Sequence, residues 1–185
     1  MKNKNNALQN QIAKESIFTA LMILMEQKSF KEISITELTK KAGVSRMAFY
    51  RNYNQMEDVI TLYLMEYLED YSKQLLNKKN FNNYESARLY FACFRKQEKL
   101  IVNLIHSNLT NLIFESNVEF FHAFSKNIVC EKPCSSKKQK YHAEFIVGGL
   151  YKVLIEWAKN GMVESDDDMA GFINALDISK AVTFA

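Results

Sequence analysis

The segment GVSRMAFYRNY, Gly43 to Tyr53, brings two arginines and three aromatic rings together directly after a glycine. Arginine bonds guanine edges or phosphate groups, methionine contacts the thymine methyl group, and a tyrosine hydroxyl reaches a phosphate oxygen. These residue types are therefore those of a nucleic-acid contact. For an isolated peptide the alternative is a solvated arginine face, so the elements around the segment have to decide between the two interpretations.

The segment separates into two faces if it is helical. At about 100° per residue, Phe49 and Tyr53 lie one turn apart on a stripe that can pack against other helices. The remaining side chains spread over a second stripe, which is richer than a face that only meets water requires: Arg46, Met47, Tyr50, Arg51 and Asn54.

The preceding residues supply the elements that would position this helix. An amphipathic helix is predicted within QIAKESIFTALMILMEQKSF, with apolar residues such as Ile17 and Leu21 at helical spacing. Thr36 is the expected N-cap of a short second helix that ends at Gly43, where a left-handed turn is possible. Val44 can fill the angle between two helices, and Ser45 can cap the third. Two short helices joined by such a turn are typical of a helix-turn-helix.

The basic charge gathers at the same end of the chain. Residues 1 to 56 carry nine Lys or Arg and four Asp or Glu, whereas the remainder carries fifteen and seventeen, within a total net charge of +3. This distribution favours a polyanionic partner at the N-terminal end.

The run ISITELTKKAGVSRMAFYRNYNQMEDV resembles the DNA-binding signature of the tetracycline-repressor (TetR) family of bacterial regulators. The resemblance implies double-stranded operator DNA as partner, with Thr36 and Tyr50 as phosphate contacts. It places Arg46, Met47 and Ala48 nearest the base edges and Arg51 beside them, and Ser45 and Asn54 complete the predicted contact set. One position departs from the pattern, because Met56 stands where the family commonly has a lysine before the glutamate. That change removes a cation near the start of the fourth helix.

The composition fits an all-α chain with an N-terminal three-helix domain and a second, all-helical domain. Of 185 residues only five are glycine and one is proline, which is few for a fold that is rich in turns. We expect the helix-turn-helix domain to span residues 1–55 and a ligand-binding and dimerisation domain to span residues 56–185. No run reaches the roughly 20 apolar residues of a membrane span, and the first residues lack the apolar core of a signal peptide. The sequence thus predicts a cytoplasmic protein without a membrane partner.

Catalytic and metal-binding patterns are not evident. There is no Gly-rich phosphate loop, G-x-S-x-G or H-E-x-x-H motif, so neither an enzyme nor a cofactor is expected. The three cysteines fit reduced thiols better than a disulfide framework. Cys130 and Cys134 could in principle hold a metal or form a redox switch, but no second Cys/His pair accompanies them and Pro133 indicates a loop.

The second domain contains an aromatic series that fits two interpretations. From about Glu57, tyrosines recur every four residues, a pattern more typical of a packing seam than of a ligand site. Large apolar residues further along fit either a plain core or a cavity for an apolar or aromatic effector. The candidate pocket residues are Tyr63, Tyr67, Phe91, Phe94, Phe114, Phe121 and Trp157.

The last two helices indicate a dimer. Gly148 and Gly149 stand in mid-helix, where glycine costs about 1 kcal/mol relative to alanine, so a close approach by another helix is expected. Ser165 with the following aspartates is the expected start of the final helix. In the TetR family the corresponding helices pair with those of a second subunit, which implies a homodimer with the interface residues Phe145, Gly149, Val153, Trp157, Phe172 and Leu176.

Two functions follow from these patterns. The first is a transcriptional repressor that binds a palindromic operator as a homodimer and is released from it by a small ligand. The alternative is an interaction protein of the same fold that acts through a protein partner. The C-terminal segment FIVGGLYKVLIEWAKNGMVESDDDMA resembles that of Gram-positive members of the TetR family, and some of these members are coactivators.

Overall fold

The computed structural model describes residues 2–77, 82–125 and 136–176, and within these ranges every regular element is a helix. This confirms the predicted all-α fold. Cys130 and Cys134 lie outside the described residues. The elements are α1 (Lys2–Met25), the 3-10 turn η1 (Phe30–Glu32), α2 (Ile35–Ala42), α3 (Arg46–Asn52), α4 (Glu57–Leu76), α5 (Asn83–Arg95), α6 (Glu98–His106), α7 (Asn111–Ser125), α8 (Ser136–Lys159) and α9 (Asp166–Ala175).

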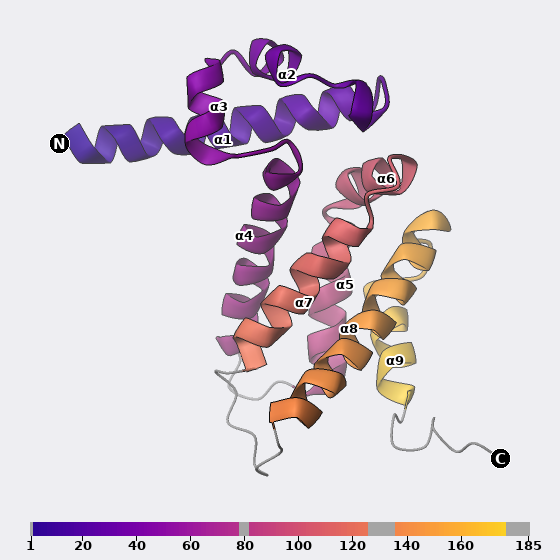
Figure 1. Cartoon of the computed structure of the whole chain (residues 1–185). Helices are drawn as coiled ribbons and strands as arrows, with labels where there is room; N and C mark the ends of the chain where they lie inside the picture. Colours follow the sequence, from indigo (N-terminus) through magenta and orange to yellow (C-terminus); the bar gives the residue numbers. More distant parts are fainter. Residues whose placement is uncertain (1, 78–81, 126–135, 177–185) are drawn as a thin grey trace.

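Helices α2 and α3 pack on α1, which is long enough to contact both of them and α4 as well (Figure 1). Ile17 and Leu21 lie one turn apart on α1, and both are fully buried together with Leu38 of α2 and Phe49 of α3. Burial of such side chains stabilises a fold by about 1.5–3 kcal/mol each. The three N-terminal helices therefore form one unit around a shared apolar centre.

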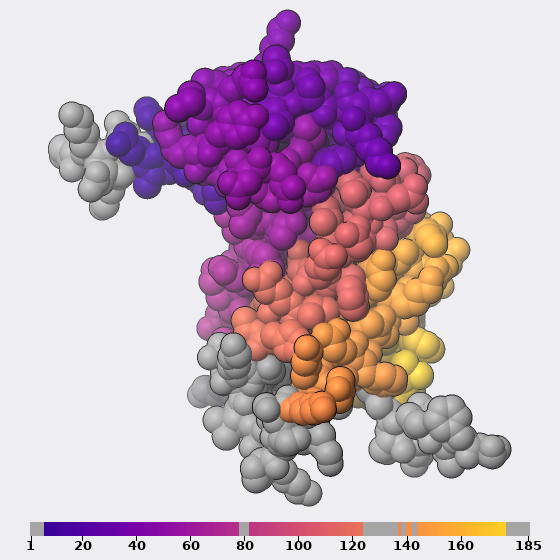
Figure 2. Space-filling view, viewed as in Figure 1, coloured from indigo at the N-terminus to yellow at the C-terminus, as the bar shows by residue number. Residues whose placement is uncertain are grey.

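Helix α4 runs from this unit into a bundle formed with α5, α7, α8 and α9 (Figure 1). Helix α7 packs between α4 and α8, and α5 packs along α9. Helix α6 contacts α1 as well as α8 and so lies between the two parts of the molecule. In the space-filling view the N-terminal residues form a broad head above this bundle (Figure 2).

The segment RLYFACFRKQEKLIVNLIHSN contains a break between α5 and α6. The N–H groups of Lys96 and Gln97 bond to the carbonyl oxygens of Cys93 and Phe94, at 3.1 and 2.9 Å, which tightens the end of α5. Helix α6 then begins after Gln97. The break allows α6 to turn away from α5 and towards α1.

Helix α9 begins after Ser165, as the sequence predicts. The Ser165 hydroxyl accepts a hydrogen bond from the N–H of Asp168 at 3.1 Å, and the Asp168 carboxylate accepts one from the N–H of Ser165 at 3.1 Å. This reciprocal pair is a capping box, and acidic residues favour the positive end of the helix dipole. The Ser165 hydrogen bonds also hold the pKa of the Asp168 carboxyl below its usual value.

Candidate nucleic-acid interface

The turn between α2 and α3 depends on Gly43. Its φ of 68° lies in the left-handed region, where glycine is favoured. The N–H of Gly43 bonds to the carbonyl of Lys40 at 3.2 Å, and the N–H of Val44 bonds to that of Thr39 at 3.0 Å. These two bonds form a Schellman motif, which satisfies the last carbonyls of α2 and reverses the chain.

The caps of the two helices differ in how well the sequence predicts them. Ser45 caps α3 as expected, because its hydroxyl accepts from the N–H of Ala48 at 3.1 Å. The expected cap of α2 is wrong. Ser34 holds that position and accepts from the N–H of Glu37 at 3.1 Å, so Thr36 lies inside the first turn of α2 with its side chain exposed.

Helix α3 presents two distinct faces. Phe49 is fully buried and Tyr53 is 5 % exposed, so both pack inward as predicted. Met47 is 74 % exposed and Tyr50 48 % exposed, which is unusual for side chains of their size. The outward face is completed by residues that are exposed, or half-buried in the case of Ala48: Ser45, Arg46, Ala48, Arg51 and, just beyond the helix, Asn54.

Electrostatics favour an anion at this face. The acidic residue of α2 is Glu37, whose carboxylate accepts a hydrogen bond from the Lys28 ammonium, and that bond holds the pKa of Glu37 below its usual value. Lys40 and Lys41 on α2 are exposed, as are the arginines of α3. The Arg46 guanidinium lies over the Tyr50 ring, 5.9 Å from its centroid. An arginine and a tyrosine hydroxyl are thus presented together.

A pair of amides holds α3 against α1, and no sequence pattern predicts it. Asn10 and Asn52 donate to each other's side-chain carbonyls, both at 2.9 Å, although they lie 42 residues apart. Asn52 also donates to the carbonyl of Ala48 at 2.9 Å. The two side-chain amides therefore position the C-terminal end of α3 against α1.

The start of α4 is closed by an internal carboxylate. Asp58 accepts from the N–H groups of Asn54, at 2.8 Å, and Gln55, at 3.2 Å. Met56 is 9 % exposed and belongs to the apolar core. Free N–H groups at a helix start attract phosphate, but here an acidic side chain already occupies two of the nearby amides, and Met56 supplies no cation.

A model of a family described as "Transcriptional regulator C-terminal region" matches residues 82–176, just over half of the chain, which span α5 to α9. The chain belongs to the TetR family of transcriptional regulators. Members of this family are regulators rather than enzymes, in agreement with the sequence.

Solved structures share this TetR-type fold. Lin0861 from Listeria innocua is 19 % identical with a TM-score of 0.75, covering 91 % of this chain and 90 % of that one. The dihydroxyacetone kinase operon activator DhaS is 12 % identical with a TM-score of 0.57, covering 91 % and 95 %. The TetR family repressor AlkX from Dietzia is 13 % identical with a TM-score of 0.55, covering 89 % and 95 %. No curated protein matches the chain.

The tyrosines of α4 join this helix to α5 and to the residue before α6. Tyr63 donates to the side chain of Gln97 at 3.0 Å, Tyr67 to the carbonyl of Cys93 at 2.5 Å, and Tyr71 to the carbonyl of Ser86 at 3.2 Å. Burial raises the pKa of all three phenols, that of Tyr67 to about 12. The hydroxyl groups on α4 are therefore used to attach it to α5 and to the start of α6.

The predicted pocket residues do not together line either of the two cavities described below. Phe91 is fully buried against the ring of Trp157, and Phe94 is 1 % exposed. Phe114 and Phe121 are half-buried on α7. The pocket that these residues would form stays a prediction.

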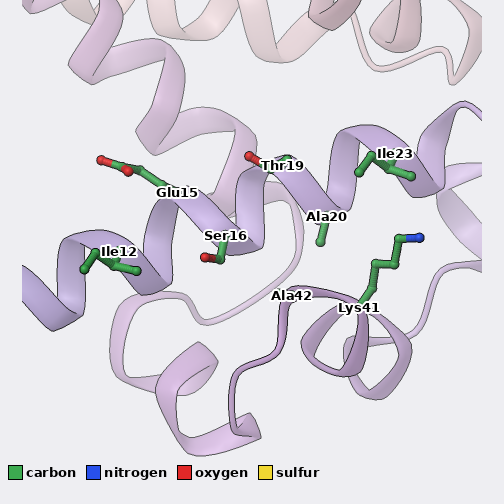
Figure 3. Close-up of a pocket in the computed structure, with 8 residues that line it drawn as sticks. All are labelled: Ile12, Glu15, Ser16, Thr19, Ala20, Ile23, Lys41 and Ala42. Carbon is green, nitrogen blue, oxygen red and sulfur yellow. The ribbon is translucent and has the colours of Figure 1, made fainter.

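Both cavities lie on α1. One, of about 360 Å³, is formed by residues of α1 and the end of α2, including Ile12, Thr19 and Lys41 (Figure 3). The second, of about 440 Å³, lies between α1 and α4, and Tyr63 is the predicted pocket residue on its wall. Among the described residues no group of three or more His, Cys, Asp and Glu could hold a metal ion. No helix there is long and apolar enough to cross a bilayer.

The predicted dimer residues are mostly open to solvent in the single chain. Phe145 is 57 % exposed and Phe172 51 % exposed, which leaves large apolar side chains on α8 and α9 without cover. Leu176 and Gly149 are exposed as well. Val153 is half-buried.

Trp157 differs from the other predicted interface residues in the single chain. It is 3 % exposed, and its indole N–H bonds to the carbonyl of Glu164 at 3.3 Å within the same chain. The ring of Trp157 packs on Phe91 of α5, so its place in a dimer interface stays a prediction.

Proposed function

We propose that this TetR-family regulator binds a palindromic operator as a homodimer through the outward face of α3. The observation that carries the proposal is the contrast within that helix between a fully buried Phe49 and a Met47 that is 74 % exposed. Exposed arginine, methionine and tyrosine side chains suit base edges and phosphates. A recognition helix of this length covers few base pairs, so two copies related by a two-fold axis would read half-sites about 34 Å apart or a multiple of that distance.

The apolar side chains left open on α8 and α9 support the dimer. Phe145, Phe172 and Leu176 are large apolar side chains that are exposed in the single chain, and exposed apolar surface commonly marks protein contacts. Phe145, Gly149 and Val153 lie four residues apart on α8 and so share one stripe. We place the second subunit on this stripe and on the exposed side of α9.

Repression with release by a small ligand is the finer part of the proposal. Ligand binding in the C-terminal region would favour a spacing of the two recognition helices that no longer fits the operator. We retain Tyr63, Tyr67, Phe114 and Phe121, which are half-buried, as the side chains best able to move aside for an apolar or aromatic effector. The neighbour AlkX, whose name connects it with the degradation of n-alkanes, supports an apolar effector.

The DNA contacts are tested by selecting the operator from random duplexes and then measuring affinity at several salt concentrations. Tyr50→Phe and Arg51→Ala should weaken binding. For Arg51→Ala the slope of log K against log salt should also fall by about 0.9 if its charge neutralises a phosphate, whereas Tyr50→Phe removes no charge and should leave the slope unchanged. Lys73→Ala at the exposed end of α4 is the matched control and should leave affinity and slope unchanged. The site is wrongly assigned if both α3 variants bind as tightly as the parent throughout the salt series.

A second candidate function is favoured by the start of α4. Met56 is buried and Asp58 already holds two amides, so this chain lacks one source of phosphate affinity. A protein of this fold that acts through a protein partner would tolerate that loss, and the name of the neighbour DhaS describes an activator. The same selection experiment discriminates: an enriched palindrome supports direct reading, whereas no enrichment together with a stable co-purifying protein supports the second function.

A further inference from the structure

One face of α1 contacts the C-terminal region at intervals of four residues. We call this face the interdomain stripe, and it consists of Lys14, Phe18 and Met22 on α1 and of Glu26 directly after the helix. Residues four apart lie above one another on a helix. The stripe therefore follows one side of α1, turning by about 40° around the axis at each step, and meets first α4 and then α6.

The two ends of the stripe are ion pairs. The Lys14 ammonium lies 2.8 Å from the Glu66 carboxylate of α4, and the Lys99 ammonium of α6 lies 3.0 Å from the Glu26 carboxylate. The Lys99 side chain is 83 % exposed and that of Glu66 is 53 % exposed. Exposed pairs of this kind contribute little to stability because solvent screens them and the side chains lose freedom. The two ion pairs therefore help to align α1 with α4 and α6 but add little to the stability of the contact.

The middle of the stripe is more buried and more specific. The rings of Phe18 and Tyr63 are stacked with centroids 3.6 Å apart and planes at 8°. The amide of Asn103, which is 5 % exposed, donates to the carbonyl of Met22 at 3.3 Å. A buried amide that lost this acceptor would have no water to replace it, so the bond is costly to break.

A hydrogen bond joins the two helices that the stripe contacts. The hydroxyl of Tyr63 on α4 donates to the side chain of Gln97, directly before α6, at 3.0 Å. The ring of Tyr63 thus stacks on α1 while its hydroxyl binds the start of α6. Neither α4 nor α6 can shift alone without straining its contact with α1.

We propose that Phe18 and Asn103 are positioning residues that set the angle between the helix-turn-helix and the C-terminal region. They touch no predicted DNA contact and act through the orientation of α1, on which α2 and α3 are packed. In a dimer held by its C-terminal helices, that angle determines the separation of the two recognition helices. This last step rests on the proposed function, whereas the angle itself does not.

The angle is measured without DNA by the distance between spin labels at K41C on α2 and K159C on α8, two exposed positions. The labels are placed in a background that carries Cys93→Ala, Cys130→Ser and Cys134→Ser, and labelled chains are diluted with an excess of unlabelled chains to remove distances between subunits. Phe18→Ala and Asn103→Leu should each broaden the distance distribution and shift its mean. Phe18→Leu, which removes the ring but keeps much of the apolar volume, provides the test if Phe18→Ala does not fold.

Tyr151→Ala is the matched control, since it also removes a half-buried aromatic ring but lies on α8 away from α1. It should lower the melting temperature and leave the label distance unchanged. The proposal is overturned if Phe18→Leu and Asn103→Leu keep the distribution of the parent, or if Tyr151→Ala alters it as much as they do.

Affinity for the selected operator gives a second readout. If the competent orientation falls to about a tenth of the population, the apparent affinity of Phe18→Leu falls about tenfold. The salt slope should not change, because the same phosphates are bound as in the parent. A changed slope would show that Phe18 affects the DNA contacts themselves. Failure of the parent to bind any DNA would refute the proposed function and leave the label distances as the test of the angle.

Discussion

The guanidinium of Arg95 lies over the indole ring of Trp157, 4.6 Å from the ring centroid. Its Nε donates to the Asp166 carboxylate at 2.8 Å, and its two terminal nitrogens donate to the carbonyls of Met162, at 2.8 Å, and Glu164, at 2.6 Å. One side chain of α5 therefore binds the end of α8, the following turn and the start of α9. It fixes the two helices that carry the proposed dimer surface.

We predict that Arg95→Met lowers the free energy of unfolding by about 2 kcal/mol, because the substitution removes both the hydrogen bonds of a charged group and a cation–π interaction. Urea unfolding followed by circular dichroism measures the change. Arg88→Met is the matched control, since its guanidinium lies 4.0 Å from Asp167 and makes a weaker, more exposed pair. Equal decreases in the two variants would mean that the interactions of Arg95 contribute no more than an ordinary surface pair.

Local chemistry makes the turn predictable from the sequence. Gly43 allows a left-handed turn through its own backbone, and Ser45 caps a helix through the N–H group three residues later. Neither effect depends on residues that are distant in the sequence. The distinction between Ser34 and Thr36 is not accessible in this way, because both are good caps and two residues of helix extension decide between them. The pairing of Asn10 with Asn52 depends on the packing of α3 on α1, which no local pattern contains.

Met56→Lys should strengthen operator binding and make the salt slope steeper by about 0.9, the value for one added phosphate contact. The lysine stem can remain against the core while its ammonium reaches solvent. Because Met56 is 9 % exposed, the same change should lower the free energy of unfolding by about 1 kcal/mol. Met56→Leu separates the two effects, since it keeps an apolar side chain and adds no charge. An unchanged slope in Met56→Lys would place this position away from the DNA.

Gly149→Ala should stabilise the separate chain and weaken the dimer. A methyl group at Gly149 meets nothing within 4 Å in this chain, so alanine gains helix propensity of about 1 kcal/mol without a clash. If the second subunit packs closely over the exposed Gly149, the added methyl group should raise the dissociation constant measured by sedimentation equilibrium. Gly148→Ala is the control, because that position also has free space but is half-buried on another side of α8. A dimer of unchanged strength in Gly149→Ala would exclude this position from the interface.

Apolar periodicity alone does not assign the aromatic residues of the C-terminal region. A stripe that faces the core and a stripe that a second subunit covers have the same spacing, so the spacing of Trp157 does not show that it is only 3 % exposed within the single chain. The tyrosine series of α4 is better specified, because four-residue spacing indicates a common face. Which partners the hydroxyl groups of Tyr63 and Tyr67 find depends on α5 and α6, and only the fold supplies them.

The buried tyrosines should make the fold sensitive to alkali. Burial raises the pKa of Tyr67 to about 12, and burial together with the Glu66 carboxylate raises that of Tyr53 to about 12, from an ordinary value of 10.0. Because each phenol is more acidic in the unfolded chain, its contribution to stability is complete below pH 10 and is lost as the pH rises through about 12. The tyrosinate absorbance of the folded protein should therefore show a late phase that is missing in concentrated urea, and urea midpoints should fall over the same interval. Tyr67→Phe should reduce this fall, and a single phase that coincides with that of the unfolded chain would contradict the burial of these hydroxyl groups.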